Sequence, residues 1–359
     1  MYASRRAGTM DLYLTDRTGT IVHRLTDAVF SETGPTWGPD GSEIAFVGTY
    51  DGVAELWAIQ PDGGGLRKII GQPDVTIPSG PAWSPDGQYI VFSARTDEPT
   101  GSEIYLVRAD GTGLTRLTYS QGFDYEPKWS PDGRQIAFTT ARTGINSLGL
   151  MNFDGSDQEV LTQSAFYPTW LPDGSAILYQ GYDAGFDLYT YRLDNGTITK
   201  LTDTPTLEEG YPAVAPDGSV AIFESLRGDS TLFDLWQIDL SSGELKQLTF
   251  STDDTGAAWA PRSQGNCRYS TAAHTDRGRA SCHGRAADDH PLTDTGADPD
   301  AHRRPNRRER RIYGNRHAAA VDLQQSAADR DRDQCDQRAA CRVGRHDRRS
   351  VVQGSTARP

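Results

Sequence analysis

A seven-residue motif of the form Pro-x-Trp-x-Pro-Asp-Gly recurs along the first 218 residues of the 359-residue chain. Its five copies place the aspartate 46, 46, 41 and 44 residues apart, and the fifth copy has Val214 in place of the tryptophan. A repeat of about 40–45 residues has the length of one four-stranded blade of a β-propeller. The copies stand at Pro35–Gly41, Pro81–Gly87, Pro127–Gly133, Pro168–Gly174 and Pro212–Gly218.

Each unit has the pattern of four short strands joined by turns. Apolar residues alternate after the Asp-Gly pair, as at Ile44 and Phe46, and a period of two indicates a half-buried strand. The Asp-Gly pair itself favours a hairpin, because glycine supplies the positive φ of the tight turn. A third strand such as Leu56–Ile59 follows, and a fourth ends on Leu-Thr, as at Leu117 and Thr118. No helical period occurs, so the expected fold class is all-β.

The two ends of the repeat array supply complementary parts of one further unit. Alignment with the next unit places Tyr2 inside a second strand, so residues 10–26 supply a third and a fourth strand. Residues 256–261 supply a first strand, which predicts that they pack beside 10–26 and close a six-bladed propeller. The motif fails at Arg262 and no Ile-x-Phe strand follows, so we expect the split closing blade to be incomplete and to lack most of one strand. The predicted repeats lie near 1–28, 33–73, 79–118, 125–162, 166–202, 210–249 and 256–262.

These motifs resemble the WD-like repeats of the TolB-type β-propeller family. The resemblance rests on Trp-Ser-Pro-Asp-Gly at Trp83 and Trp129, on the Ile-x-Phe strand and on the Leu-Thr exit, and it covers residues 1–262. It implies a six-bladed propeller. It implies much less about function, because scaffolds, peptidase gate domains and sensor regions all carry this propeller.

The composition changes abruptly after Arg262. Residues 1–262 carry a net charge of −19 and all seven Trp, whereas residues 263–359 carry 19 Arg, no Lys and a net charge of +6. Only seven of those last residues are Val, Ile, Leu, Met, Phe or Trp. So few apolar groups cannot offset chain entropy, and we expect a disordered Arg-rich tail. The change of composition also favours the hypothesis of a gene fragment whose tail is frameshifted.

Charge and spacing exclude several classes of partner. The acidic field of residues 1–262 repels phosphate, which argues against nucleic acid, and no apolar run of about 20 residues is long enough to insert into a membrane. The four Cys do not have the paired spacing of a zinc site, so we predict no metal and no cofactor. Residues 1–10 contain no hydrophobic signal region, and the sequence leaves the localisation and the oligomeric state open.

Candidate catalytic residues are few. The Pro-Asp-Gly aspartates stand where a turn is expected and the repeated tryptophans where blades pack together, so a structural role is favoured for both. Nucleophilic hydrolysis needs a nucleophile and a base, but no Gly-x-Ser-x-Gly elbow occurs and His23 is the only histidine before Arg262. We therefore predict a protein that is not an enzyme, with a carboxylate-pair hydrolase left open because acids are abundant.

The loops that lead into the first strands gather acidic and aromatic residues. In a propeller these loops open on one face, so we expect their side chains to surround one mouth of the central channel. A solvated acidic surface is the alternative. Carboxylates beside rigid aromatics favour a cationic peptide or protein segment, and in TolB-like proteins such a face takes up peptides or other proteins. The predicted binding residues are Asp124, Tyr125, Glu126, Tyr167, Glu208, Glu209, Tyr211, Asp253 and Asp254.

Two functions are compatible with these features. The first is a non-catalytic propeller scaffold that binds a protein or peptide at the channel mouth. The second is the detached gate propeller of a prolyl-oligopeptidase-type serine peptidase or of another hydrolase, because those enzymes carry a similar propeller beside their catalytic domain. A downstream reading frame with a nucleophile elbow would favour the second.

We predict that residues 263–359 have no stable fold. Limited proteolysis should cut soon after Arg262 and leave a compact acidic core. Deletion of 263–359 should leave the midpoint of thermal unfolding nearly unchanged, because few apolar groups are available to dock. A large loss of thermal stability on that deletion would show that the tail supplies a strand or a cap.

Overall fold

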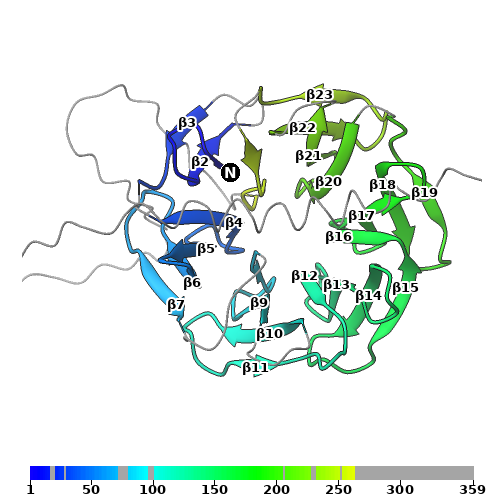
Figure 1. Cartoon of the computed structure of the whole chain (residues 1–359), viewed down its shortest axis with the longest axis horizontal. Helices are drawn as coiled ribbons and strands as arrows, with labels where there is room; N and C mark the ends of the chain where they lie inside the picture. The colour runs from blue at the N-terminus through cyan, green and yellow to red at the C-terminus, as the bar shows by residue number, and fades with distance from the viewer. Residues whose placement is uncertain are drawn as a thin grey trace, which may run out of the picture. The chain divides into compact units, whose positions relative to one another are not determined.

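Six antiparallel sheets of four strands each make up the described part of the chain. The computed structural model describes residues 1–16, 21–27, 30–71, 80–95, 101–204, 207–227, 232–250 and 253–262. The predicted disordered tail, 263–359, lies outside the described residues. Figure 1 shows the six sheets arranged as blades around a common centre, which confirms the predicted six-bladed propeller.

The blades are numbered in chain order, with blade 1 as the split blade. In each blade the four strands pair in the order first, second, third, fourth, and Figure 1 shows the first strand innermost and the fourth outermost. Blade 1 consists of β24 (Asp254–Thr255), β1 (Tyr2–Ser4), β2 (Asp11–Thr15) and β3 (Ile21–Arg24), and blade 2 of β4 (Ser31–Trp37), β5 (Ile44–Tyr50), β6 (Val53–Ile59) and β7 (Arg67–Ile70). Blade 3 consists of β8 (Ala82–Trp83), β9 (Tyr89–Arg95), β10 (Ser102–Arg108) and β11 (Thr115–Arg116), and blade 4 of β12 (Asp124–Trp129), β13 (Gln135–Thr140), β14 (Ser147–Asn152) and β15 (Glu159–Gln163). Blade 5 consists of β16 (Ala165–Trp170), β17 (Ala176–Tyr182), β18 (Phe186–Arg192) and β19 (Ile198–Lys200), and blade 6 of β20 (Leu207–Val214), β21 (Val220–Arg227), β22 (Phe233–Asp239) and β23 (Leu245–Gln247).

The hydrophobic core lies between neighbouring blades. The alternating residues of the second strands are buried as predicted, and Ile44 and Phe46 have no exposed surface. These two pack in one cluster with Leu12 and Leu25 of blade 1, so each interface joins the apolar faces of two blades. The described residues contain no helix at all, and therefore none that could span a membrane.

The Pro-Asp-Gly motif is a structural turn, as predicted. The carboxylate of Asp40 accepts a hydrogen bond from the backbone N–H of Ser42, two residues on, at 2.9 Å. Gly41 has a φ of +73°, which an L side chain rarely adopts. The aspartates of the other four copies accept a bond from the N–H two residues on in the same way.

Two further parts of the repeat tie strands and blades together. The indole Nε1 of Trp129 donates to the carbonyl of Ala82 in the preceding blade at 3.2 Å, which confirms that the tryptophans belong to the blade interfaces. In blades 1, 3, 5 and 6 the threonine of the Leu-Thr pair accepts a bond from the N–H fourteen residues earlier, as Thr118 does from Ile104 at 2.9 Å. The Leu-Thr pair thus fixes the fourth strand on the third, outside the β-ladder itself.

The split blade closes the ring with its four strand positions filled. Tyr2–Ser4 takes the second-strand position, and β24 pairs with it through Ala3 and Ser4 only. Ala258 exchanges backbone hydrogen bonds with Met1 and packs on the cluster that contains Leu12, which confirms the predicted contact of 256–261 with 10–26. The split blade is incomplete as expected, because β1 has three residues where the second strands of the other blades have six to eight.

A buried ion pair joins the N-terminal and C-terminal parts of blade 1, at the junction that we call the seam. Asp254 has no exposed surface, and Arg6 from the β1–β2 loop donates to both of its carboxylate oxygens at 3.1 Å. Removal of one partner of a buried pair leaves an uncompensated charge, which costs about 3–5 kcal/mol.

We predict that Arg6→Met lowers the free energy of unfolding by about 3 kcal/mol, because methionine retains the apolar stem but leaves Asp254 without this counter-ion. The measurement is urea unfolding followed by tryptophan fluorescence. Arg134→Met is the matched control, since the Arg134 side chain is 85% exposed in its pair with Asp132. Equal stability of the two variants would show that the seam does not depend on the pair.

Candidate functional site

The first strands share one irregularity at the residue before the motif proline. In β4, β12, β16 and β20 the pairing register shifts across this residue, which forms a bulge. The bulge residue has a positive φ in these four strands, and so does Gly256 at the same position in blade 1. A bulge re-aims a side chain, and a residue other than glycine at positive φ is uncommon. The bulge residues with positive φ are Gly34, Glu126, Tyr167, Tyr211 and Gly256.

The residue at the bulge position differs between two groups of neighbouring blades. Blades 4, 5 and 6 carry Glu126, Tyr167 and Tyr211, whereas blades 1, 2 and 3 carry glycine. A Cβ atom on Gly34 would lie 2.6 Å from the Cα of Gly80, so glycine is required where the backbones of blades 2 and 3 touch. At the bulge position itself, a side chain is therefore presented by blades 4, 5 and 6, and glycine stands in blades 1, 2 and 3.

These side chains contact one another and lie within electrostatic range of acids from other elements. The rings of Tyr167 and Tyr211 stack with their centroids 3.6 Å apart, and Tyr125 contacts Tyr167 edge to face at 6.1 Å. The charge of Glu126 acts on both Tyr211 and Glu224, although blade 5 lies between blades 4 and 6 in the ring. Side chains of alternate blades can approach one another only near the propeller axis. The six residues of this axial cluster are Tyr125, Glu126, Tyr167, Tyr211, Glu224 and Asp253.

Burial sets the electrostatics of the axial cluster. Desolvation by burial raises the pKa of Glu224 to about 8. The hydrogen bond from the N–H of Gly256 opposes this rise, and the nearby charges of Glu126 and Asp253 add to it. Burial also raises the pKa of Glu126, with Lys128 opposing the shift from 3.6 Å. The pKa of Tyr211 lies well above 10, again chiefly through burial. The cluster thus holds carboxyl groups that a bound cation would help to ionise.

Polar side chains of the second strands hold the bulges in place. Glu224 on β21 accepts a hydrogen bond from the N–H of Gly256 at 2.6 Å, and Thr139 on β13 accepts one from the N–H of Tyr167 at 3.0 Å. In both cases the acceptor belongs to the preceding blade. A bulge takes a backbone N–H out of the β-ladder of its own blade, and in these two cases a side chain of the preceding blade accepts the hydrogen bond instead. These bonds fix the bulge residues relative to the neighbouring blade.

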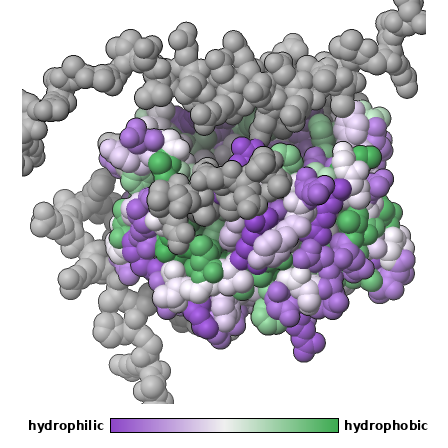
Figure 2. Space-filling model, turned by 60° about the horizontal axis from the view of Figure 1, so that its bottom comes forward, coloured by the Kyte–Doolittle hydropathy of each residue, from purple (hydrophilic) through white to green (hydrophobic). Residues whose placement is uncertain are grey.

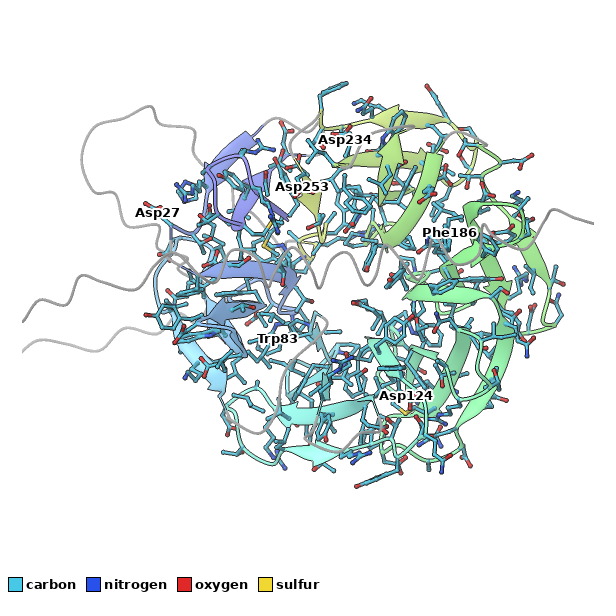
Figure 3. The ribbon with its side chains drawn as sticks, in the orientation of Figure 1. Asp27, Trp83, Asp124, Phe186, Asp234 and Asp253 are labelled. Atoms are coloured by element: carbon cyan, nitrogen blue, oxygen red, sulfur yellow. The ribbon has the colours of Figure 1, made fainter. Side chains whose placement is uncertain are left out.

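The structure brings together five of the nine residues predicted from the sequence. Tyr125, Glu126, Tyr167 and Tyr211 are partly exposed members of the axial cluster, and the Asp253 side chain retains 21% exposure beside Arg5. Figure 3 shows Asp253 at the junction of the split blade and blade 6. These five remain predicted ligand contacts.

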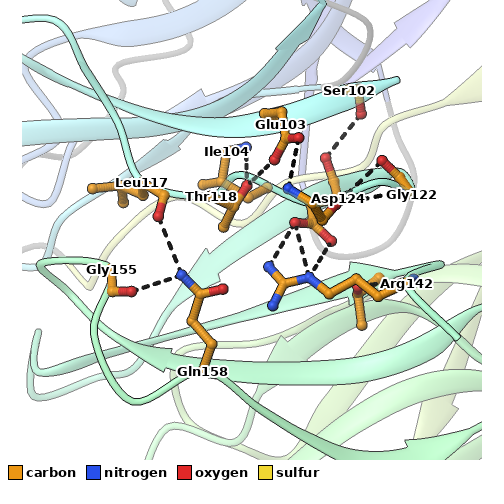
Figure 4. Close-up of polar contacts among 12 residues, drawn as sticks. Ser102, Glu103, Ile104, Leu117, Thr118, Gly122, Asp124, Arg142, Gly155 and Gln158 are labelled. Carbon is orange, nitrogen blue, oxygen red and sulfur yellow. Dashed lines mark hydrogen bonds and ion pairs between the residues drawn. The ribbon is translucent and has the colours of Figure 1, made fainter. Parts of the chain in front are cut away.

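The other four predicted residues lie apart from the cluster. Asp124, Glu209 and Asp254 have no exposed surface, so they cannot contact a ligand as expected. Asp124 is paired with Arg142 at 2.7 Å inside blade 4, as Figure 4 shows. The threonine hydroxyls of blade 5 donate to Glu209. Each of these acids stands two residues before a bulge residue, where the strand buries its side chain. Glu208 is exposed on β20 and is not one of the groups that interact in the cluster.

Glu224 is the member that sequence reasoning missed. It lies on a second strand, directly after the buried Phe223, whereas the predicted residues all lie on or before first strands. A comparison of the second strands could have identified Glu224, because it is the one acid at this position in the six described blades. The equivalent residues of the other blades are Ala3, Val47, Ser93, Thr139 and Gln180.

Chemistry beyond binding has little support among the described side chains. No group of three or more His, Cys, Asp or Glu residues among them is arranged to hold a metal ion. The imidazole of His23 is exposed on β3, the outermost strand of blade 1. The arrangement is suited to the recognition of a cation by aromatic faces and carboxylates.

A family model described as the TolB beta propeller domain matches residues 67–263. The match covers more than half of the chain, and the chain belongs to this family.

Individual proteins resemble this chain over parts of their length. The Protein TolB homolog of Chlorobium luteolum is 32% identical over 147 residues, which are 40% of this chain and 33% of that protein. Dipeptidyl-peptidase 5 of Porphyromonas gingivalis is 26% identical over 286 residues, which are 72% of this chain and 40% of that protein. The crystal structure of TolB from Acinetobacter baumannii superposes with a TM-score of 0.64 at 21% identity, over 73% of this chain and 66% of that chain. This chain therefore spans 40% or less of the two sequence relatives, and the structural likeness shows the fold alone.

The raised pKa of Glu224 predicts a pH dependence of stability. A carboxyl whose pKa is higher in the folded than in the unfolded state stabilises the fold while it is protonated. Its contribution is complete below its ordinary pKa of 4.5 and is lost as the pH rises through about 8. The thermal midpoint of the wild type should therefore be lower at pH 9 than at pH 6.

Glu224→Gln should reduce this difference in thermal midpoint between pH 6 and pH 9, because the amide keeps an acceptor for Gly256 without ionising. Glu208→Gln, on the exposed face of β20, should leave the difference unchanged, and equal profiles for all three proteins would contradict the assignment.

Proposed function

We propose that this propeller is a non-catalytic binding module that takes up a basic segment of a protein partner at the axial cluster. The observation that supports the proposal is the convergence of partly exposed acids and tyrosines from blades 1, 4, 5 and 6 near the propeller axis. Rigid aromatic rings provide contact area at low entropic cost, and carboxylates select a positively charged group.

The charge of the propeller supports a basic partner. Residues 1–262 carry a net charge of −19, so a cationic segment is attracted from a distance as well as at contact. The attraction between exposed charges is screened over about 8 Å at physiological ionic strength. Affinity should therefore fall as salt rises, as it does for other interfaces steered by charge.

Exposed apolar residues on the same face support a protein as the partner. The antiparallel order of each blade places the loops into the first strands and the second-to-third hairpins at one end of the propeller. Figure 2 shows hydrophobic residues interspersed with hydrophilic ones over the visible side of the molecule. The large apolar residues exposed in these loops or at the strand ends beside them are Tyr50, Val53, Tyr119, Phe123, Ile145, Tyr182, Leu232 and Phe250.

A second candidate function is the propeller domain of a peptidase. The observation that favours it is the alignment with dipeptidyl-peptidase 5, which covers 72% of this chain but only 40% of that enzyme. Sequencing of the genomic region tests this candidate. An adjoining reading frame that encodes a Gly-x-Ser-x-Gly elbow would support it, and the absence of such a frame would favour the binding module.

The binding proposal is tested with a fluorescein-labelled hexapeptide in which arginine alternates with glycine. Fluorescence anisotropy should show that Glu126→Gln with Asp253→Asn weakens binding by about tenfold and reduces its salt dependence, because two carboxylates of the axial cluster are neutralised. The control is Asp62→Asn with Asp110→Asn, which neutralises two exposed turn residues at the opposite end of the blades and should change little. A peptide affinity that ignores the first pair and responds to the second would refute the axial cluster as the site.

A further inference from the structure

Six aromatic rings form an unbroken row from an exposed hairpin of blade 5 to the propeller axis. Tyr182 contacts Phe186 at 4.9 Å between ring centroids, and Phe186 contacts Phe166 edge to face at 5.8 Å. Phe166 lies 6.2 Å from Tyr167, which is stacked on Tyr211 and also contacts Tyr125. Figure 3 shows Phe186 within blade 5. The aromatic row thus begins outside the axial cluster and ends in it.

The aromatic row is not a requirement of the blade. The pairing registers of β4, β5 and β6 place Thr33, Thr49 and Ala54 of blade 2 where blade 5 has Phe166, Tyr182 and Phe186. Blade 2 nevertheless forms the same four-stranded sheet. The three aromatic side chains are therefore additions to the common framework of the repeat.

The rings of the aromatic row remain accessible. Tyr182 is 45% exposed, and the other five residues retain part of their surface, although Tyr125 and Tyr211 are buried enough to raise their pKa. Aromatic rings that serve only as core are removed from solvent, as Phe46 is in blade 2. The row is therefore a line of partly exposed aromatic residues that ends beside the carboxyl groups of Glu126, Glu224 and Asp253.

We propose that the aromatic row binds an extended, proline-containing peptide segment whose basic residue lies at the axial end. Proline-rich segments adopt the polyproline II conformation and dock on aromatic-lined surfaces at low entropic cost. The charge of the axial cluster is complementary to arginine or lysine at one end of such a segment. This inference rests on the proposed function and names the partner segment in more detail.

Three labelled peptides test the proposal by fluorescence anisotropy on the full chain. They are a run of six prolines ending in arginine, the same run ending in glutamate, and a Gly-Ser run of equal length ending in arginine. The proline–arginine peptide should bind about tenfold more tightly than the Gly-Ser–arginine peptide. Comparable affinity for the two arginine peptides would overturn the aromatic row as the site while leaving the proposed function intact. Failure of both arginine peptides to bind would count against the proposed function itself.

Variants locate the preference for proline on the molecule. Tyr182→Ser changes an exposed side chain and should remove most of the preference without affecting the Gly-Ser–arginine peptide, and Phe186→Leu should act in the same way. The matched control is Tyr50→Ser, which removes an exposed tyrosine from the corresponding hairpin of blade 2 and should have no effect. Retention of the proline preference in Tyr182→Ser and Phe186→Leu would overturn the proposal. A second outcome would also overturn the proposal: cellohexaose binds and its binding requires Tyr182, whereas peptide binding does not require Tyr182. The aromatic row would then be a carbohydrate-binding surface.

Discussion

The ring of blades closes through the split blade, and both the packing of the blades and the axial cluster require this closure. Residues from opposite ends of the described chain meet there, through two paired residues of β1 and β24, the Met1 and Ala258 backbones and the Arg6 and Asp254 ion pair. Each blade buries its apolar faces only against neighbours, so an open ring would expose two such faces. The same closure brings Asp253 to the axial cluster and Gly256 to Glu224. Stability and the candidate site therefore depend on one seam.

The bulge before the motif proline turns a symmetric fold into an asymmetric site. Every blade has the same four strands, yet the glycine half of the innermost ring brings backbones into contact and the other half presents side chains. The positive φ at Glu126, Tyr167 and Tyr211 is a local strain that the neighbouring blades maintain, as Thr139 does for the N–H of Tyr167. The aromatic row on blade 5 extends this half outward. The repeated framework therefore does not fix the residue at the bulge position or at the aromatic positions of blade 5, and these are the positions at which we propose that a ligand is recognised.

The fold could be predicted almost entirely from the sequence, because its determinants are local. The alternation at Ile44 and Phe46 and the turn at Asp40 depend on residues only a few positions apart. The site was less predictable. Asp124 and Glu126 lie two residues apart at the start of the same strand. Asp124 is buried, whereas Glu126 at the bulge is partly exposed, and the amino-acid composition of this segment does not predict that difference. Glu224 stands out in the sequence only when the second strands of the repeats are compared, and its approach to Gly256 of the next blade depends on closure of the ring.

We propose that a basic segment binds at the axial cluster, beside the innermost strands of blades 4, 5, 6 and 1. The most direct measurement is hydrogen–deuterium exchange by mass spectrometry, with and without the arginine–glycine hexapeptide. We expect added protection at residues 124–129, 165–170, 207–214 and 253–258, because the innermost strands of blades 4, 5, 6 and 1 carry the cluster. Protection confined to the third-to-fourth turns, or to the innermost strands of blades 2 and 3, would contradict it.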